Sequence, residues 1–338
     1  MINKGDGMRR ILASAVTAFA VAASLFVASP AQAAEAAISG EGSSFAYNFL
    51  NKCAADYKAK TGNSVTYTAS GSGAGRSSFA AGTKDFAGSD AVYSSADKVI
   101  PSNYVTVPVI GGPVAIIFNV AGVKDLNLDA ATLGNIFSGA ITTWNDAAIK
   151  KLNPKASLPA SNIVVAYRSK NSGTTQNLFS YLNANGGSFA GGQAWAAGGG
   201  VATGKGVAQS SDMAYTVAHT ADTIGYVDLP DVDVKVGKVA LKNASGKFVK
   251  PTAAAAQKFL SKQTINADGS VNINWTKKVT GGYNLSIVTY MFINKGNSAT
   301  SAFAQFAVST CGKKPFKGYT GFAGANLKKA AALAKSGA

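Results

Sequence analysis

The sequence is poor in the residues on which most enzyme and metal sites depend. It contains one histidine, His219, and only two cysteines among 338 residues. A single histidine excludes the common multi-histidine metal sites, and neither a His-Glu-x-x-His nor a Cys-x-x-Cys motif occurs. The nucleophile elbow Gly-x-Ser-x-Gly and the phosphate loop Gly-x4-Gly-Lys-[Ser/Thr] are missing as well. We therefore expect no enzyme activity, no cofactor and no bound metal, and we place His219 in a loop or on the surface.

Acidic residues are also scarce, with 16 Asp and Glu against 32 Lys and Arg, which gives a formal net charge of +16. A chain this basic suggests a nucleic-acid partner as one hypothesis. The lysines, however, are scattered, and no basic segment is interleaved with aromatic residues for base stacking. We therefore expect no nucleic-acid partner. We interpret the charge as a basic surface that attracts anions generally or adheres to an acidic envelope.

The apolar run at the N-terminus, Ile11–Val27, is too short for an ordinary transmembrane helix, which needs about 20 residues. Basic residues precede it and the small-residue sequence Ala31-Gln-Ala33 follows, a pattern typical of a secretory signal peptide. A permanent membrane anchor is the competing interpretation. We assign residues 1–33 to a signal peptide cleaved near Ala33, with no cysteine nearby for a lipid anchor. The expected product is periplasmic or extracellular, and its roughly 305 residues are enough for two domains.

One strand–turn–helix junction carries an arginine beside a turn rich in hydroxyl groups. The apolar run Ile163–Val165 predicts a buried strand, and Leu178 and Leu182 lie at helical spacing further on. Arg168 and the turn Ser172-Gly-Thr-Thr175 lie between them. Unpaired backbone N–H groups and the helix dipole at such a turn suit an oxyanion, and Arg168 adds a charged donor. From this motif alone, an ordinary capped helix with a solvated arginine is the simpler interpretation.

A second junction follows Gly40-Glu-Gly-Ser-Ser44. Apolar residues spaced four apart predict an amphipathic helix with Ser44 as its N-cap; they are Phe45, Phe49, Cys53 and Tyr57. The side chain of Phe45 is expected in the core.

Two further junctions lie close behind. The strand Val65–Thr68 runs into a glycine-rich turn, Ser70–Gly75, and then into a predicted helix. Asp90 ends the short apolar run Asp85–Asp90. Asp90 alone is explained equally well as a turn or N-cap residue, but the junctions taken together favour an oxyanion site.

These motifs give the chain a resemblance to the periplasmic phosphate-binding proteins of ABC transporters, from about Ile38 to about Phe306. The matching segments, in the family's order and spacing, are Gly40–Phe45, Gly71–Gly75, Asp85–Asp90, Pro108–Gly112, Ile136–Asp146, Leu152–Pro154, Arg168–Thr175 and Ile224–Tyr226. The alternation of strands and helices independently predicts an α/β fold with helices on both faces of the sheets.

The resemblance implies a two-lobed periplasmic-binding-protein fold of type II, with the ligand in the cleft between lobes that close like a hinge. Residues 34–114 plus 285–338 would form lobe I and residues 115–284 lobe II. The apolar runs Val105–Ile110 and Ser286–Asn294 are candidates for the two crossovers, and Val114–Val120 is expected to be a strand.

The resemblance also implies phosphate ligands, which we carry over residue by residue. They are Ser44, the backbone of Phe45, Ser72 and Asp90 from one side, and Arg168, Ser172, Gly173 and Thr174 from the other. Asp90 fits phosphate because an ionised carboxylate only accepts hydrogen bonds, and monohydrogen phosphate has a proton to donate whereas sulfate near neutral pH has none. A buried unpaired acceptor facing sulfate would cost several kcal/mol.

Two positions depart from the family pattern. Lys170 stands where an aspartate commonly pairs with the arginine two residues earlier. Either another carboxylate orients Arg168, or the arginine is looser and Lys170 adds positive potential. Glu41 replaces a small residue beside the first turn.

The two cysteines, Cys53 and Cys311, would share one lobe. Their even number and the oxidising destination of an exported chain favour a disulfide, and two buried free thiols are the alternative.

We therefore expect a monomeric protein that captures inorganic phosphate and delivers it to a membrane permease and its ATPase. A secreted phosphate-binding adhesin or scavenger is the alternative, motivated by the basic surface and the missing lipid anchor. A secreted phosphatase is a third and weak hypothesis, because no catalytic residues can be named.

Overall fold

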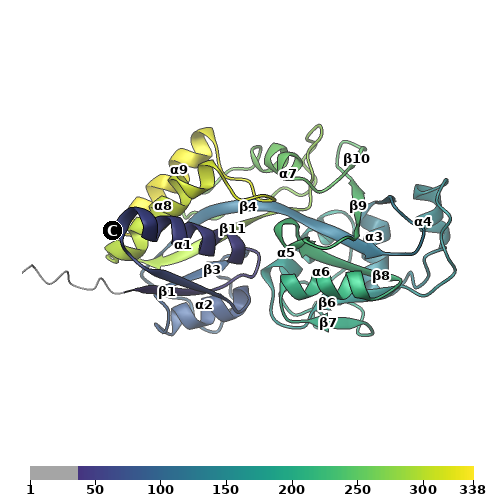
Figure 1. Cartoon of the computed structure of the whole chain (residues 1–338), viewed down its shortest axis with the longest axis horizontal. Coiled ribbons are helices and arrows are strands. Elements are labelled where there is room, and N and C mark those ends of the chain that lie inside the picture. The colour runs from purple at the N-terminus through teal and green to yellow at the C-terminus, as the bar shows by residue number, and fades with distance from the viewer. Residues whose placement is uncertain (1–36) are drawn as a thin grey trace, which may run out of the picture. The chain divides into compact units, whose positions relative to one another are not determined.

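One long central strand, β4 (Tyr104–Asn119), joins the two halves of the sheet (Figure 1). In this computed structural model, which describes residues 37–338, β4 pairs antiparallel with β11 (Ser286–Asn294) from Tyr104 to Pro113. From Val114 onward it pairs antiparallel with β8 (Thr223–Asp228). Every residue from Val105 to Phe118 is buried, as expected for a central strand that is covered on both faces.

The segments Val105–Ile110 and Val114–Val120, expected as a crossover and a separate strand, lie almost wholly within β4. The glycine pair Gly111-Gly112 lies in the middle of β4, and neither position has room for a side chain. A Cβ atom on Gly112 would lie 2.9 Å from the ring of Phe45, and one on Gly111 would lie 2.9 Å from the backbone oxygen of Ile287.

On one side of β4 the strand order is β2, β1, β3, β11, β4. Strand β1 (Ile38–Gly42) is parallel to β2 (Val65–Ala69) and to β3 (Phe86–Ser89), and β11 is antiparallel to β3. The helices of this part are α1 (Tyr47–Thr61), α2 (Ser72–Ala80), α8 (Ser298–Ser309) and α9 (Gly324–Lys335).

Beyond β4 the order continues β8, β6, β7, with β6 parallel to both neighbours. Strand β9 pairs antiparallel with β4 and β10 and parallel with β5. The remaining strands are β5 (Leu126–Leu128), β6 (Val164–Arg168), β7 (Lys205–Val207), β9 (Gly237–Lys242) and β10 (Phe248–Val249). The remaining helices are α3 (Ala130–Ser138), α4 (Ala147–Leu152), α5 (Gly173–Ala184), α6 (Ser210–His219), α7 (Ala253–Leu260) and the 3-10 turns η1 (Leu229–Asp231) and η2 (Cys311–Lys313). The predicted α/β class is confirmed.

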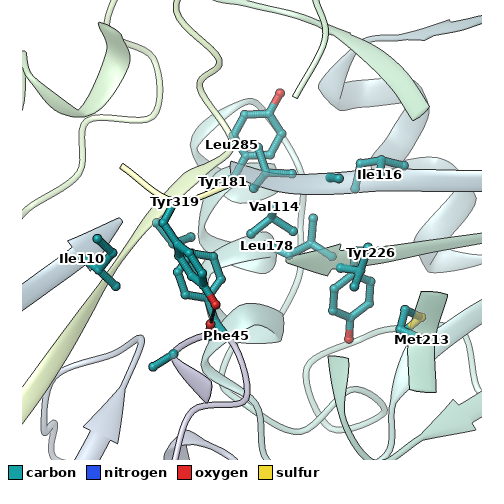
Figure 2. Close-up of a cluster of buried hydrophobic side chains, with 14 of the residues drawn as sticks. Phe45, Ile110, Val114, Ile116, Leu178, Tyr181, Met213, Tyr226, Leu285 and Tyr319 are labelled. Atoms are coloured by element: carbon teal, nitrogen blue, oxygen red, sulfur yellow. Dashed lines mark hydrogen bonds between the residues drawn. The ribbon is translucent and has the colours of Figure 1, made fainter. Parts of the chain in front are cut away.

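The predicted apolar stripe of the first helix is buried in the core. Figure 2 shows part of this core, including Phe45 before α1 and Tyr319 from the C-terminal segment. Their rings meet edge to face at 5.3 Å, and the Tyr319 hydroxyl donates to the backbone oxygen of Phe45 at 2.5 Å. Burial of one such aromatic side chain stabilises a fold by about 1.5–3 kcal/mol, so these contacts fix the segment that leads into α1.

Cys53 and Cys311 form a disulfide, with their Cα atoms 5.8 Å apart. The bond joins α1 to η2, the turn that follows α8. It therefore ties the C-terminal segment to the first helix.

Two predictions, the signal peptide and the division into two lobes, are not tested by these elements. The signal peptide lies outside the described residues. Within residues 37–338, no helix combines the length and apolar character needed to cross a membrane. The predicted lobe boundaries fall inside β4 and just before β11, and the division into two lobes stays a prediction.

Candidate functional site

The first helix begins later than we predicted, so Ser44 is not its N-cap and instead contacts Arg168. Helix α1 starts at Tyr47, and its N-cap residue, Ala46, has no capping side chain, so the assignment of Ser44 as N-cap is wrong. Instead the Ser43 hydroxyl accepts from the Ala46 N–H at 3.3 Å. The Ser44 hydroxyl accepts from Nη1 of Arg168 at 3.0 Å.

The glycine-rich segment is mostly helix rather than turn, because α2 already starts at Ser72. Gly71 makes the turn before it with φ 98°, and a Cβ there would lie 2.7 Å from the backbone oxygen of Asn171. Gly75 packs α2 directly on β1, since its Cβ would lie 2.6 Å from the Cα of Gly42. These glycines bring Ser72 close to the end of β3.

Asp90 follows β3 and accepts hydrogen bonds from three hydroxyl groups. Ser43 donates to Oδ1 at 2.6 Å, Thr289 donates to Oδ1 at 2.6 Å, and Ser72 donates to Oδ2 at 3.2 Å. The Asp90 side chain is thereby held in one orientation by β11, by α2 and by the segment before α1.

The electrostatic environment of Asp90 balances opposing effects. Burial raises the pKa of this carboxyl group above its usual value. The hydrogen bonds from Ser43, Thr289 and Ser72 and the positive charge of Arg168 act in the opposite direction. The three hydroxyl donors together favour the ionised, accepting form of the carboxylate.

Arg168, the last residue of β6, is 2 % exposed and is held at both edges of its guanidinium group. Its Nε and Nη2 atoms both donate to the backbone oxygen of Ala208, at 3.1 and 2.7 Å. Its Nη1 atom donates to Ser44 and, at 3.3 Å, to Ser210. A solvated arginine is thus excluded, and the Nη1 end contacts Ser44, another predicted ligand.

The start of α5 lies against Ser72 and Asp90. Ser172 is the N-cap, and its hydroxyl accepts from the Thr175 N–H at 3.4 Å, so the capped-helix interpretation holds as well. A Cβ on Gly173 would lie 2.5 Å from Oγ of Ser72 and 2.8 Å from Cβ of Asp90. Only glycine allows this close approach between α5 and the end of β3.

Several backbone N–H groups at these junctions are left without a protein acceptor. Among residues 37–338, we find no hydrogen-bond acceptor for the N–H groups of Ser44, Phe45, Gly173 and Thr174. All four residues are buried. Because buried N–H groups are almost always paired in folded proteins, the cluster indicates a site for an anionic ligand.

Four residues at the site were missed by the sequence analysis. Ser43 and Thr289 hold Asp90, whereas Ser210 and Asp228 lie on the Arg168 side. Ser210 could have been found, since it opens α6 behind a short strand and Gln209 and Asp212 form a capping box around it. Asp228 is the last residue of β8, and Asp90 is the first residue after β3. Thr289 lies inside an apolar strand and gives no sequence signal.

The two departures from the family pattern take no part in this cluster. Lys170 is exposed, two residues beyond the end of β6. The Glu41 carboxylate accepts a short hydrogen bond from Ser78 on α2. His219, as expected, is exposed at the end of α6.

The strand order, the helix starts and the buried donors define an α/β protein with a candidate anion site. A family profile described as a PBP superfamily domain matches residues 28–310, so the chain belongs to the PBP superfamily.

Curated relatives carry related names. The chain is 37% identical over 219 residues to the phosphate-binding protein PstS of Xylella fastidiosa, covering 64% of this chain and 60% of that protein. It is 45% identical over 127 residues to the phosphate-binding protein PstS 3 of Mycobacterium leprae, covering 36% of this chain and 34% of that protein. The chain thus spans 60% of the length of the first of these relatives and about a third of the length of the second.

Solved structures agree on the fold. A high-affinity periplasmic phosphate-binding protein solved with phosphate superposes with a TM-score of 0.70 at 21% identity, covering 88% of this chain and 93% of that one. A phosphate transport receptor from Vibrio cholerae superposes with a TM-score of 0.56 at 20% identity, covering 82% and 96%. At these identities the likeness shows the fold alone.

Proposed function

We propose that this protein is a solute-binding protein that captures inorganic phosphate. The observation that carries the proposal is the buried cluster of unpaired N–H groups at the starts of α1 and α5, next to the Arg168 guanidinium and the Asp90 carboxylate. The N–H groups, the hydroxyl groups and Arg168 supply donors for the oxygens of an oxyanion.

Asp90 narrows the choice of anion. A buried carboxylate beside an anion site is repulsive unless the ligand donates a proton to it. Monohydrogen phosphate and arsenate have such a proton, whereas sulfate near neutral pH lacks one. The names of the curated relatives, which are phosphate-binding proteins, support the same choice.

The ligands are those carried over from the resemblance. Phosphate contacts Ser44, the N–H of Phe45, Ser72 and Asp90 on one side of the site. On the other side it contacts Arg168, Ser172, Gly173 and Thr174. Residues 34–114 plus 285–338 and residues 115–284 act as two lobes, which close over the ligand by bending near β4 and β11.

The bound phosphate is then delivered to an ABC permease and its ATPase in the membrane, by a monomeric carrier that works in the periplasm or outside the cell. The names of the relatives and the description of the Vibrio cholerae structure as a transport receptor support this role over an adhesin or a scavenger. They equally support binding over phosphatase chemistry.

Calorimetric titration of the purified protein with phosphate, arsenate and sulfate tests the proposal. Phosphate and arsenate should bind at one site per chain, and sulfate at a hundredfold higher concentration should not compete. Equal affinities for sulfate and phosphate would contradict the role of Asp90, and no binding of any of the three would contradict the function.

A further inference from the structure

Asp228 and Ser210 form a buried pair behind Arg168. The Ser210 hydroxyl donates a short hydrogen bond to Oδ2 of Asp228, and both residues are buried. The Ser210 oxygen also accepts from Nη1 of Arg168 at 3.3 Å and lies 2.9 Å from the Ser44 hydroxyl. Neither Ser210 nor Asp228 belongs to the predicted phosphate ligands.

The buried Arg168 guanidinium needs such a partner. Arg168 makes no ion pair with a carboxylate among residues 37–338, and Lys170, at the position where an acid could have paired with it, is exposed. The backbone oxygen of Ala208 holds one edge of the guanidinium but carries no formal charge. Asp228 reaches the other edge through the Ser210 hydroxyl.

The chemistry of the donors and acceptors fixes the direction of each hydrogen bond that links Asp228, Ser210, Arg168 and Ser44. Burial raises the pKa of Asp228 well above its usual value, and its Oδ2 oxygen accepts the hydrogen bond from Ser210, so the Ser210 proton points toward Asp228. The guanidinium can only donate, so the Ser210 oxygen accepts from Nη1. That leaves the Ser44 hydroxyl as the donor to Ser210 until an anion is present, when its proton is free to turn toward the ligand.

We propose that Asp228 and Ser210 are positioning residues of the phosphate site, which hold the Nη1 end of Arg168 and the Ser44 hydroxyl so that both point at the same anion. The proposal rests on the proposed function. Asp228 also accepts from the hydroxyl of Thr174 at 3.4 Å, so the same carboxylate connects the starts of α5 and α6.

The test is a double-mutant cycle measured by phosphate calorimetry. Ser210→Ala should weaken phosphate binding by about five- to tenfold, because Nη1 of Arg168 loses one of its acceptors and its link to Asp228. In an Arg168→Ala background the same Ser210→Ala change should alter the affinity by less than about twofold. A residue that acted only on general stability would weaken binding equally in both backgrounds.

Matched variants separate positioning from folding. Ser211→Ala, at the exposed next position of α6, should leave the affinity unchanged. Ser210→Thr, which keeps the hydroxyl, should restore binding to within about threefold of the parent. Asp228→Asn should weaken binding as Ser210→Ala does. Asp222→Asn, at the residue that precedes β8, should not.

Two results would overturn the inference in different ways. If the parent binds phosphate normally and Ser210→Ala matches Ser211→Ala, or is additive with Arg168→Ala, the positioning role is wrong while the proposed function stands. If the parent binds no phosphate, both fall. Should Asp228→Asn fail to fold, the Ser210 cycle decides alone, because removing one hydroxyl group leaves the buried volume nearly unchanged.

Discussion

Nη1 of Arg168 lies 3.0 Å from the hydroxyl oxygen of Ser44, although 124 positions separate the two residues in the sequence. The contact joins the end of β6 to the segment before α1, on opposite sides of β4 in the sheet order. It therefore brings together residues from the two sets of predicted phosphate ligands.

The first prediction concerns this contact. Arg168→Ala should weaken phosphate binding at least tenfold, because a charge-assisted hydrogen bond contributes about 1.5–3 kcal/mol. Lys170→Ala is the matched control, since Lys170 is a nearby exposed cation and its removal should change the affinity by less than about twofold. Calorimetry of both variants checks the prediction. Unchanged affinity in Arg168→Ala would remove this residue from the site.

A second prediction follows from the three hydroxyl groups that hold Asp90. Asp90→Asn should reduce the preference for phosphate over sulfate by at least tenfold, because the asparagine amide can donate a hydrogen bond to a fully deprotonated anion. Competition titrations with both anions measure this ratio. Asp85→Asn serves as the control, since Asp85 accepts from Ser39 outside the site. A ratio of phosphate to sulfate affinity equal to that of the parent would show that Asp90 does not accept a hydrogen bond from the ligand proton.

A third prediction uses the close approach of Gly173 to Ser72 and Asp90. Gly173→Ala places a methyl group 2.5 Å from Oγ of Ser72, closer than real contacts allow, so Ser72 and Asp90 must shift. Phosphate binding should fall at least tenfold, a loss of about 1.4 kcal/mol or more. Gly134→Ala, on α3, is the control because its Cβ meets nothing closer than 3.7 Å. Equal binding by the two variants would contradict the geometry of the α5 start.

Some strands and site residues could be predicted from the sequence, and others could not. The strand–turn–helix pattern predicted β2, β3, β6 and the positions of Asp90 and Arg168, because apolar runs and hydroxyl-rich turns are local signals. The resemblance supplied the grouping of the ligands.

Other features depend on contacts between distant segments. Thr289 donates to Asp90 across 199 positions, and Ser210 meets Ser44 across 166. Such pairs follow from the order of strands in the sheet, which periodicity does not encode. The late start of α1 was missed for a related reason: Phe45 and Tyr319 pack together and hold the preceding backbone outside the helix.

A fourth prediction concerns pH. Burial raises the pKa of Asp231 to about 7, and its hydrogen bond from Asn48 only partly opposes the rise. The folded state thus holds this proton more tightly than the unfolded state. The stability from protonation is complete below the usual value near 3.8 and is lost as the pH rises through about 7.

Asp231→Asn should therefore be more stable than the parent at pH 8, by on the order of 1–3 kcal/mol, because it removes a buried charge. That advantage should shrink at pH 5, where the parent carboxyl is protonated. Thermal unfolding without phosphate at both pH values measures the difference. Ser211→Ala is the control, because it removes no ionisable group, and its offset should be the same at both pH values. A pH-independent offset for Asp231→Asn would contradict the raised pKa.

The last prediction concerns the disulfide between Cys53 and Cys311, which joins α1 to η2. Its sequence separation of 258 places most of the described chain inside one covalent loop. Closing so long a loop restricts the unfolded chain, and the chain-entropy treatment gives a stabilisation near 5 kcal/mol for it. Replacing both cysteines by alanine should therefore lower the free energy of unfolding by about 2–5 kcal/mol.

Denaturant unfolding measures that loss. The reduced parent protein is the comparison, and it should unfold at nearly the same denaturant concentration as the double variant. Thiol labelling of the unfolded, unreduced parent should detect no reactive thiol, and two reactive thiols per chain would rule the bond out. Because the disulfide anchors α1 some distance from Ser44 and Phe45, phosphate affinity in the double variant should stay within about threefold of the parent as long as the fold is intact.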